Sequence, residues 1–485
     1  MADDDAPRGS DVEQIRNDGP NVLMVMADQH RADWMGCAGA EWVHTPNLDA
    51  LAERGTRFTR AVCNAPVSAP SRAALASGRR CSDVGVLTNG HLFPYDVPTY
   101  YQHLRVAGYR VGCVGKTDLH KRDHWEGARG DRPVMHHLGF TDPTETEGKM
   151  SAGRRYDRGP VCPYQHYLTD RGLFDRFVED YSHTRKGQPV WYAADSVLPA
   201  EAYHDEWIGR TACDFLREVP PGSPWHYFVS FVGPHDPWDS PSEYMARYRD
   251  AEMPSAIADP LEGKPRWHVE RAERMSGQMT AEDRANVQRQ YCGMVELIDT
   301  WLGRMVSVLK ARGMYENTVI IYCADHGELL GDHGLFQKQA YYESSVRVPI
   351  LVAGPGVKAR GDCDALVELY DLAPTVLEIG GAEALPEMSA RSLMPVLRGE
   401  EDEHREYQFS ELHGEPGRSE TRMVFDGRHK LIERAGDLAQ LYDLAEDPGE
   451  LINLVERDTK TVARLRDVLD DQFGPLPQSE PTEDA

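Results

Sequence analysis

The chain has 485 residues, of which 40% are hydrophobic and 27% are charged, so it can bury a substantial core as a globular protein. Its formal net charge of −26 argues against general nucleic-acid binding, which requires a basic face. A local cluster of cationic side chains can still bind an anionic substrate within such an acidic protein, because its field acts at short range.

The N-terminal stretch and the cysteines bear on where the protein works. Residues 1–19 are acidic and lack the basic and apolar regions of a signal peptide, so we expect a disordered lead. No apolar run is long enough to cross a bilayer. Nine scattered cysteines without a Cys-x-x-Cys pair favour reduced thiols. We expect a cytoplasmic protein with no membrane or nucleic-acid partner, or a periplasmic one if a leader has been removed.

Short apolar runs, each followed by a polar residue, are typical of strands that are buried on both faces of a parallel sheet. A helical pattern follows Thr280, a predicted N-cap paired with Asp283, and ends before Gly313. Strands that alternate with helices predict an α/β fold with a large, mostly parallel sheet over residues 20–375. The predicted strands are 21–27, 109–114, 227–232 and 318–324.

Two regions depart from this alternation. Residues 121–200 are rich in polar and aromatic side chains, and we expect an insertion at the rim of the active site that contacts substrate. From residue 376 to 474, strands at 421–425, 429–432 and 441–444 and a helix at 457–473 predict a small α+β subdomain. The last residues, 475–485, are predicted to be a disordered tail.

Polar residues follow the predicted strands at their carboxyl ends, where α/β sheets bind ligands. Asp28 and Gln29 follow the first strand, and Asp325 and His326 follow a later one. Carboxylate, amide and imidazole groups form a mixed oxygen and nitrogen site, which favours calcium, with magnesium or manganese as alternatives, over zinc. The sequence therefore predicts a divalent-metal site formed by these four residues.

The segment from Ser68 to Arg72 reads Ser-Ala-Pro-Ser-Arg and is followed by Ser-Gly-Arg. If a helix starts here, Arg72 lies one turn after Ser68 on the same face, and its guanidinium suits a sulfate or phosphate. The helix N-terminus adds attraction for an anion. Lys116, His235 and other basic residues at strand ends would supply positive charge and a general acid.

Taken together, these motifs resemble the type I sulfatases of the alkaline phosphatase superfamily. The resemblance rests on the segments 21–29, 45–49, 68–72, 108–116, 234–235, 324–327, 331–338 and 441–454. It implies a metal-dependent hydrolase of sulfate esters. Because the insertion at 121–200 is polar and aromatic, we expect the substrate to be a sulfate ester of a carbohydrate. The resemblance also implies that Ser68 is oxidised to formylglycine by a maturation enzyme. By position, the residues around the sulfate would be Arg72, Lys116, His120, His235 and Lys338.

Three departures from the commoner pattern leave alternatives open. Gln29 and His326 stand where many relatives have acidic or amide residues, a variant that resembles choline sulfatases and phosphonate monoester hydrolases. His120 lies two residues further along than the family's usual histidine. Serine at position 68 requires a serine-type maturase or is an engineered replacement of cysteine. A phosphodiester or phosphonate ester hydrolase, and an anion-binding protein without activity, are the competing hypotheses.

Overall fold

The computed structural model describes residues 19–121, 127–153, 159–414 and 420–476. The predicted lead at 1–19 and the predicted tail at 475–485 lie almost entirely outside these residues. The main element is an eight-stranded sheet in the order β5-β4-β6-β1-β7-β8-β2-β9. All neighbouring strands pair in parallel except β8, which is antiparallel to both β7 and β2. The prediction of a large, mostly parallel sheet is confirmed.

The four strands predicted from apolar runs lie side by side at the centre of this sheet. They are β4 (Arg110–Gly115), β6 (Trp225–Pro234), β1 (Asn21–Asp28) and β7 (Thr318–Ala324). Every residue of β1, β6 and β7 is buried, which is why their sequences are apolar without alternation. The outer strands are β5 (Asp142–Glu145), β8 (Ile350–Ala353), β2 (Thr56–Phe58) and β9 (Gly361–Cys363).

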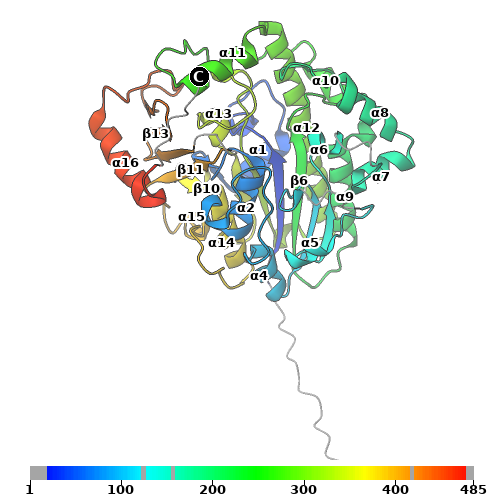
Figure 1. Ribbon diagram of the computed structural model, residues 1–485. Coiled ribbons are helices and arrows are strands. Elements are labelled where there is room, and N and C mark those ends of the chain that lie inside the picture. Colours follow the sequence, from blue (N-terminus) through cyan, green and yellow to red (C-terminus); the bar gives the residue numbers. More distant parts are fainter. Residues whose placement is uncertain (1–18, 122–126, 154–158, 415–419, 477–485) are drawn as a thin grey trace, which may run out of the picture.

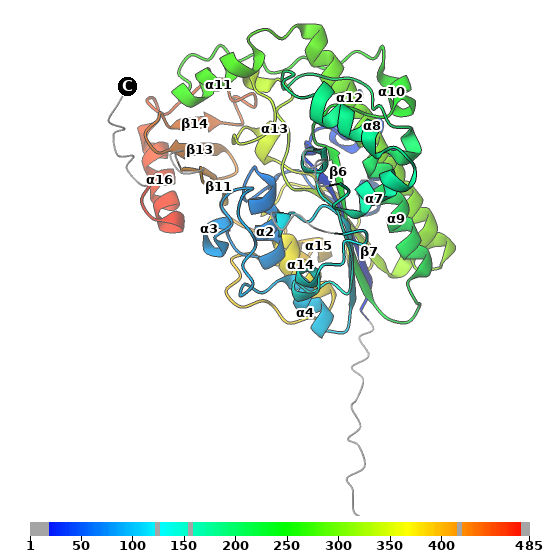
Figure 2. The ribbon, with the colours of Figure 1, turned by 45° about the vertical axis from the view of Figure 1, so that its right-hand side comes forward.

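Helices cover both faces of the sheet, and β1 contributes alternate side chains to each layer (Figure 2). Val22, Met24 and Met26 pack toward α2 (Ser68–Ser77), α4 (Tyr100–Val106) and α14 (Leu372–Ile379). On the other face, Leu23 and Val25 pack toward α9 (His204–Glu218) and α12 (Ala281–Ala311). The predicted capping box of Thr280 and Asp283 begins α12.

The C-terminal part forms a separate four-stranded antiparallel sheet, β11-β12-β13-β14, with α16 packed on it (Figure 1). Its strands are β11 (Gln408–Leu412), β12 (Thr421–Phe425), β13 (His429–Arg434) and β14 (Gln440–Asp443), and α16 spans Thr459–Phe473. The small α+β subdomain is confirmed, and β11 is a strand that the sequence pattern did not indicate. The proposed boundary at residue 376 stays a prediction.

The remaining elements connect these layers. Within the predicted insertion at 121–200, β5 joins the edge of the main sheet beside β4, and α7 (Pro163–Asp170) and α8 (Phe174–Glu179) pack near α9. A further helix, α11 (Arg266–Ser276), and the short α13 (Glu343–Val346) lie between the main sheet and the C-terminal sheet (Figure 2). No helix in the described part of the chain is long and apolar enough to cross a membrane.

Candidate active site

The carboxyl ends of β1 and β7 bring together three potential metal ligands. These strands are neighbours in parallel register, so Asp28 at the end of β1 lies beside Asp325 and His326, which follow β7. One carboxylate oxygen from each aspartate and one ring nitrogen of His326 all lie within 4.8 Å of one another. Asp28 Oδ1 is buried without a hydrogen-bond partner among the described residues. An open carboxylate oxygen beside a second carboxylate and an imidazole fits a divalent cation.

Ser68 is the first residue of α2 and faces this cluster. The preceding Val67 is extended, and Gly78 ends the helix in the left-handed conformation, with φ of 65°. Ser68 Oγ lies 3.0 Å from His326 Nε2, and both side chains are buried. His326 Nδ1 lies 3.0 Å from the Gly327 carbonyl, which can only accept. Nδ1 therefore carries the ring proton, and Nε2 accepts a hydrogen bond from Ser68.

Burial favours the neutral form of this imidazole. Burial lowers the pKa of His326 to about 4, although Asp325 and Asp28 act in the opposite direction. At neutral pH its Nε2 lone pair therefore faces Ser68 Oγ, with Asp325 Oδ1 at 3.7 Å and Asp28 Oδ1 at 3.9 Å. The serine hydroxyl and the metal-ligand set thus belong to one site.

Arg72 links α2 to the ends of the strands. Its Nε donates to Asp325 Oδ2 at 2.8 Å, and its Nη1 donates to Ser230 Oγ at 2.8 Å and to the backbone oxygen of Lys116. Its Nη2 is buried, lies 3.9 Å from Asp28 Oδ2, and has no hydrogen-bond partner among the described residues. A guanidinium held on three sides with one open N–H group is suited to bind an anion.

Lys116 lies directly after β4 and contacts the same aspartate from the other side. Its Nζ donates to Asp28 Oδ2 and lies 3.1 Å from Asp118 Oδ2. Burial alone would raise the pKa of Asp28, but the cations Lys116, Arg72 and Lys338 hold that pKa well below its ordinary value. Asp28 is therefore ionised at neutral pH, as a metal ligand must be.

A second group of polar side chains surrounds Lys338. Its Nζ lies 2.6 Å from His235 Nε2 and donates to Gln29 Oε1. His235 Nδ1 lies 2.6 Å from the Asp236 backbone oxygen, so Nδ1 carries the proton and Nε2 accepts from Lys338. Burial lowers the pKa of Lys338. Because Gln29 Oε1 accepts from Lys338, the role of Gln29 as a metal ligand stays a prediction.

His120 contacts residues outside this cluster. Its Nε2 is 2.9 Å from the Phe93 backbone oxygen, its ring lies 5.0 Å from that of Tyr95, and its carbonyl accepts from Arg132. The contacts described above bring the other nine predicted site residues together, and the catalytic role of His120 stays a prediction.

Some buried acids of the site were not singled out by the sequence pattern. Glu328 accepts from Gln29 Nε2 and from the backbone N–H groups of Leu330 and Gln337, and burial raises its pKa to about 7. Asp118 pairs with Lys116, and Asp236 with His235. Each of these acids lies within two residues of a predicted site residue in the sequence. That proximity is the feature by which the sequence could have indicated them.

The comparisons with known proteins agree with this geometry. The family model described as "Sulfatase" matches residues 20–382, and a model described as "N-sulphoglucosamine sulphohydrolase, C-terminal" matches residues 331–474. A choline-sulfatase of Rhizobium meliloti is 28% identical over 93% of this chain and 86% of its own. An N-acetylglucosamine-6-O-sulfatase of Bacteroides thetaiotaomicron is 26% identical over 90% of this chain and 82% of its own.

Solved structures show the same fold. The phosphonate monoester hydrolase of Agrobacterium radiobacter superposes with a TM-score of 0.76 at 24% identity, covering 93% of this chain and 95% of that chain. A protein in complex with its substrate D-glucosamine-2-N,6-O-disulfate superposes with a TM-score of 0.74 at 21% identity, covering 94% of this chain and 98% of that chain. Because the sulfatase model matches well over half of the residues, the chain belongs to the sulfatase family and is a sulfuric ester hydrolase.

Proposed function

We propose that this protein hydrolyses a sulfate ester of a carbohydrate. Residue 68 would carry the nucleophile, and a divalent cation would bind beside that residue. The observation that carries the proposal is the contact between Ser68 Oγ and His326 Nε2 at 3.0 Å, within the Asp28 and Asp325 cluster. A nucleophile position, a metal-ligand set and open cationic donors meet there in one buried place, as sulfate-ester hydrolysis requires.

The four proposed metal ligands are Asp28, Gln29, Asp325 and His326. Oxygen donors with one imidazole and no thiolate favour calcium, with magnesium or manganese as alternatives. When bound, the cation would supply positive charge that polarises the sulfate oxygens. Arg72 supports the set, because it neutralises part of the charge of Asp325 through its 2.8 Å ion pair and fixes the direction of that carboxylate.

The nucleophile is proposed to derive from Ser68. A maturation enzyme that removes two hydrogens from its side chain would leave formylglycine, whose hydrate is a stronger nucleophile than the alcohol. His326 Nε2 lies 3.0 Å from the oxygen at this position, so a cation held by that nitrogen would stand beside the oxygen and favour its deprotonated form. Unmodified serine would depend on that cation alone for activation.

The cations around Ser68 have separate proposed tasks. Arg72 Nη2 and Lys116 Nζ would bind oxygens of the sulfate and stabilise the charge that develops on them. Lys338 and His235, joined at 2.6 Å, form a pair that would pass a proton to the departing alcohol. His120 is proposed as a further donor only if the ring leaves its contact with Phe93.

A carbohydrate substrate, as a small molecule or an oligosaccharide, is supported by the relatives and by the predicted insertion. One relative is named an N-acetylglucosamine-6-O-sulfatase, and one solved neighbour holds a glucosamine disulfate as its substrate. A cavity of about 570 Å³ is lined by Tyr181, Tyr192 and Arg185 of the insertion and by Asp236 and Trp238. Aromatic and polar side chains in one cavity suit a sugar ring.

The cytoplasmic location also remains our proposal. All nine cysteines are free of disulfide bonds, and eight of them are buried. Thiols that persist unpaired in this number are typical of a reducing compartment.

Two measurements test the proposed function. Mass spectrometry of the peptide that contains Ser68, taken from protein made in its native host, should show the loss of two hydrogens or the hydrate of that product. Sulfate and phosphate esters of one chromogenic alcohol should then be assayed in parallel, with Ser68→Ala as the inactive control. Faster turnover of the phosphate ester would favour the phosphorus-ester alternative, and plain serine in an active enzyme would contradict the formylglycine step.

A further inference from the structure

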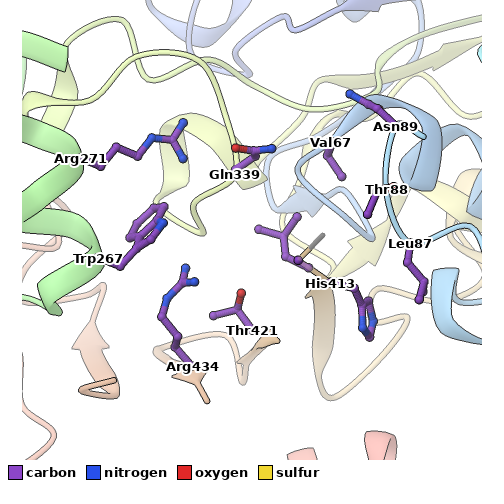
Figure 3. Close-up of a pocket in the computed structure, with 12 residues that line it drawn as sticks. Val67, Leu87, Thr88, Asn89, Trp267, Arg271, Gln339, His413, Thr421 and Arg434 are labelled. Atoms are coloured by element: carbon purple, nitrogen blue, oxygen red, sulfur yellow. The ribbon is translucent and has the colours of Figure 1, made fainter. Parts of the chain in front are cut away.

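A second cavity has a volume of about 200 Å³. It lies between Val67 and residues of the C-terminal sheet such as Thr421 and Arg434 (Figure 3). Its walls come from parts of the chain that are distant in sequence: the segment before α2, residues 87–89, the helix α11, Gln339, and the strands β11, β12 and β13 with the residues after β11. The lining residues used below are Val67, Asn89, Trp267, Arg271, Gln339 and Arg434.

This cavity shares its inner wall with the catalytic cluster. Val67 directly precedes Ser68, and Asn89 Oδ1 accepts from the backbone N–H of Ala69 at 2.9 Å. Gln339 follows Lys338 and donates its backbone N–H to the Pro66 carbonyl at 3.1 Å. A group bound in the cavity would therefore lie close to the position of Ser68 in the fold.

The outer wall carries two guanidinium groups with an indole between them (Figure 3). The Arg434 guanidinium carbon lies 4.3 Å from the centre of the Trp267 ring, and that of Arg271 lies 5.2 Å from it. Arg271 Nη2 donates to the Lys338 carbonyl at 2.7 Å, which ties this wall to the catalytic lysine. Stacking against an aromatic face leaves the N–H edge of Arg434 able to bind an anion in a bidentate manner, whereas Nε and Nη2 of Arg271 already donate to Met275 and to backbone carbonyls.

Arg434 has no ion-pair partner within the described part of the chain, although it is only half exposed to solvent. The nearest acid that affects it is Asp437, whose carboxylate accepts from the backbone N–H groups of Arg266 and Trp267 at the start of α11. A half-buried arginine without a carboxylate partner is uncommon, because burial of an unbalanced charge is costly. Such a cation is suited to receive its counter-charge from a ligand.

We propose that this cavity binds a second anionic group of the substrate, a carboxylate or a further sulfate, through Arg434, with Arg271 adding positive charge nearby. The inference rests on the proposed sulfatase function and specifies its substrate class: sulfate esters whose alcohol portion carries another negative charge close to the ester. Trp267 would contact the sugar ring that joins the two anionic groups. The acidic surface of the protein does not oppose this, because the charge that acts on the ligand is the local one.

The test compares matched substrates that differ in one charge. Glucosamine 2-N,6-O-disulfate is measured against N-acetylglucosamine 6-sulfate, whose amide is neutral, for a second sulfate, and methyl glucuronide 2-sulfate against methyl glucoside 2-sulfate for a carboxylate. The readout is the ratio of kcat/KM for the dianion to that for the monoanion. We expect a ratio of about tenfold or more for at least one pair, carried mainly by KM, since a bidentate charged contact is among the strong hydrogen bonds.

Arg434→Gln should lower that ratio about tenfold, and Arg434→Lys, which keeps the charge but loses the bidentate edge, should give an intermediate ratio. Arg457→Gln is the matched control, because Arg457 is exposed and does not line the cavity. Melting temperatures of all three variants show whether the fold is retained. A wild-type ratio near one for both pairs, or an equal ratio in wild type and a folded Arg434→Gln protein, would overturn the proposal.

A binding measurement separates this inference from the proposed function. Calorimetric titration of the Ser68→Ala protein with each disulfate and monosulfate reports the anion site without any turnover. If no sulfate ester is hydrolysed but the dianions still bind more tightly through Arg434, the proposed function fails and the anion site stands. If esters are hydrolysed but binding is indifferent to the second charge, the anion site fails alone.

Discussion

Replacing Lys430 by methionine should weaken the attachment of the C-terminal sheet to the catalytic part. Lys430 lies on β13 and is fully buried; its Nζ donates to Glu343 Oε1 at 2.6 Å, to Glu450 Oε1 at 2.9 Å and to the Tyr341 carbonyl at 2.9 Å. Glu343 and Tyr341 belong to the segment around α13, so two of these contacts join the C-terminal sheet to the catalytic part. Methionine fills a similar volume but leaves two carboxylates without their cation.

The magnitude follows from the burial of the pair. Removing one partner of a buried ion pair costs about 3–5 kcal/mol, because the other charge stays desolvated. The entropy of unfolding is about 2.1 cal/mol/K per residue, or about 1 kcal/mol/K for a chain of this length, so the melting temperature should fall by about 3–5 °C. Glu450→Gln added to Lys430→Met should recover part of this loss, while Glu343 keeps Arg347 at 3.3 Å.

Differential scanning calorimetry of the single and double variants measures these shifts. Lys460→Met is the matched control, because Lys460 is exposed near the start of α16 and should shift the melting temperature by less than 1 °C. The reasoning is refuted if Lys430→Met melts with the control, or if the double variant is less stable than the single one.

The contribution of this ion pair to the free energy of unfolding depends on pH in a direction that can be worked out. Burial raises the pKa of Glu343, but Lys430 and Arg347 outweigh it, so the pKa stays below the ordinary 4.5. A carboxyl group with a lowered pKa stabilises the fold above its unfolded pKa, and this contribution is lost as the pH falls below about 4.5. The pKa of Lys430 is raised above 10.5 despite its burial, and its contribution is lost only at higher pH. The difference in stability between wild type and Lys430→Met should therefore be largest from about neutral pH to pH 10 and shrink toward acid, where the carboxylates that lost their cation take up protons.

Three further predictions concern the site and the core. Calcium at a hundredfold excess over Kd should stabilise the wild type by about 2.7 kcal/mol, seen as a rise in melting temperature, and Asp28→Asn should remove most of this stabilisation. A full calcium effect in the variant would exclude Asp28 as a ligand. His235→Gln should lower kcat about 10²-fold or more for alkyl sulfates and much less for 4-nitrophenyl sulfate, whose alcohol leaves without a proton; equal losses would argue against proton transfer. Gly209→Ala should destabilise the protein by about 1–3 kcal/mol, since the new methyl would lie 2.1 Å from Trp301 Cδ2, and an unchanged melting temperature would contradict this packing.

The central strands and their terminal residues could be predicted because both follow from local sequence. Strands β1, β4, β6 and β7 are apolar runs buried on both faces, and in a parallel sheet the residues that follow them must meet at one edge. This reasoning is enough to place Asp28 beside Asp325. The capping box of Thr280 is equally local, and it correctly predicted where α12 begins.

Features that depend on contacts distant in sequence could not be predicted. His120 and His235 look alike as single histidines after a strand, yet the first contacts a backbone carbonyl and the second contacts Lys338. Only the folded chain distinguishes them. The pairing of β5 with β4 could not be predicted either, because a four-residue edge strand is too short to show a clear hydrophobic periodicity.

One strand of the C-terminal sheet has consequences for how substrate range can change. Lys430 and Arg434 stand four residues apart on β13, so their side chains project from the same face at a separation of about 13 Å. The first side chain fastens the sheet and the second lines the cavity next to Ser68. Under the proposed anion site, substitutions at Arg434 would change substrate selectivity while Lys430 keeps the C-terminal sheet attached. New substrates could then be gained without altering the residues proposed to break the ester bond.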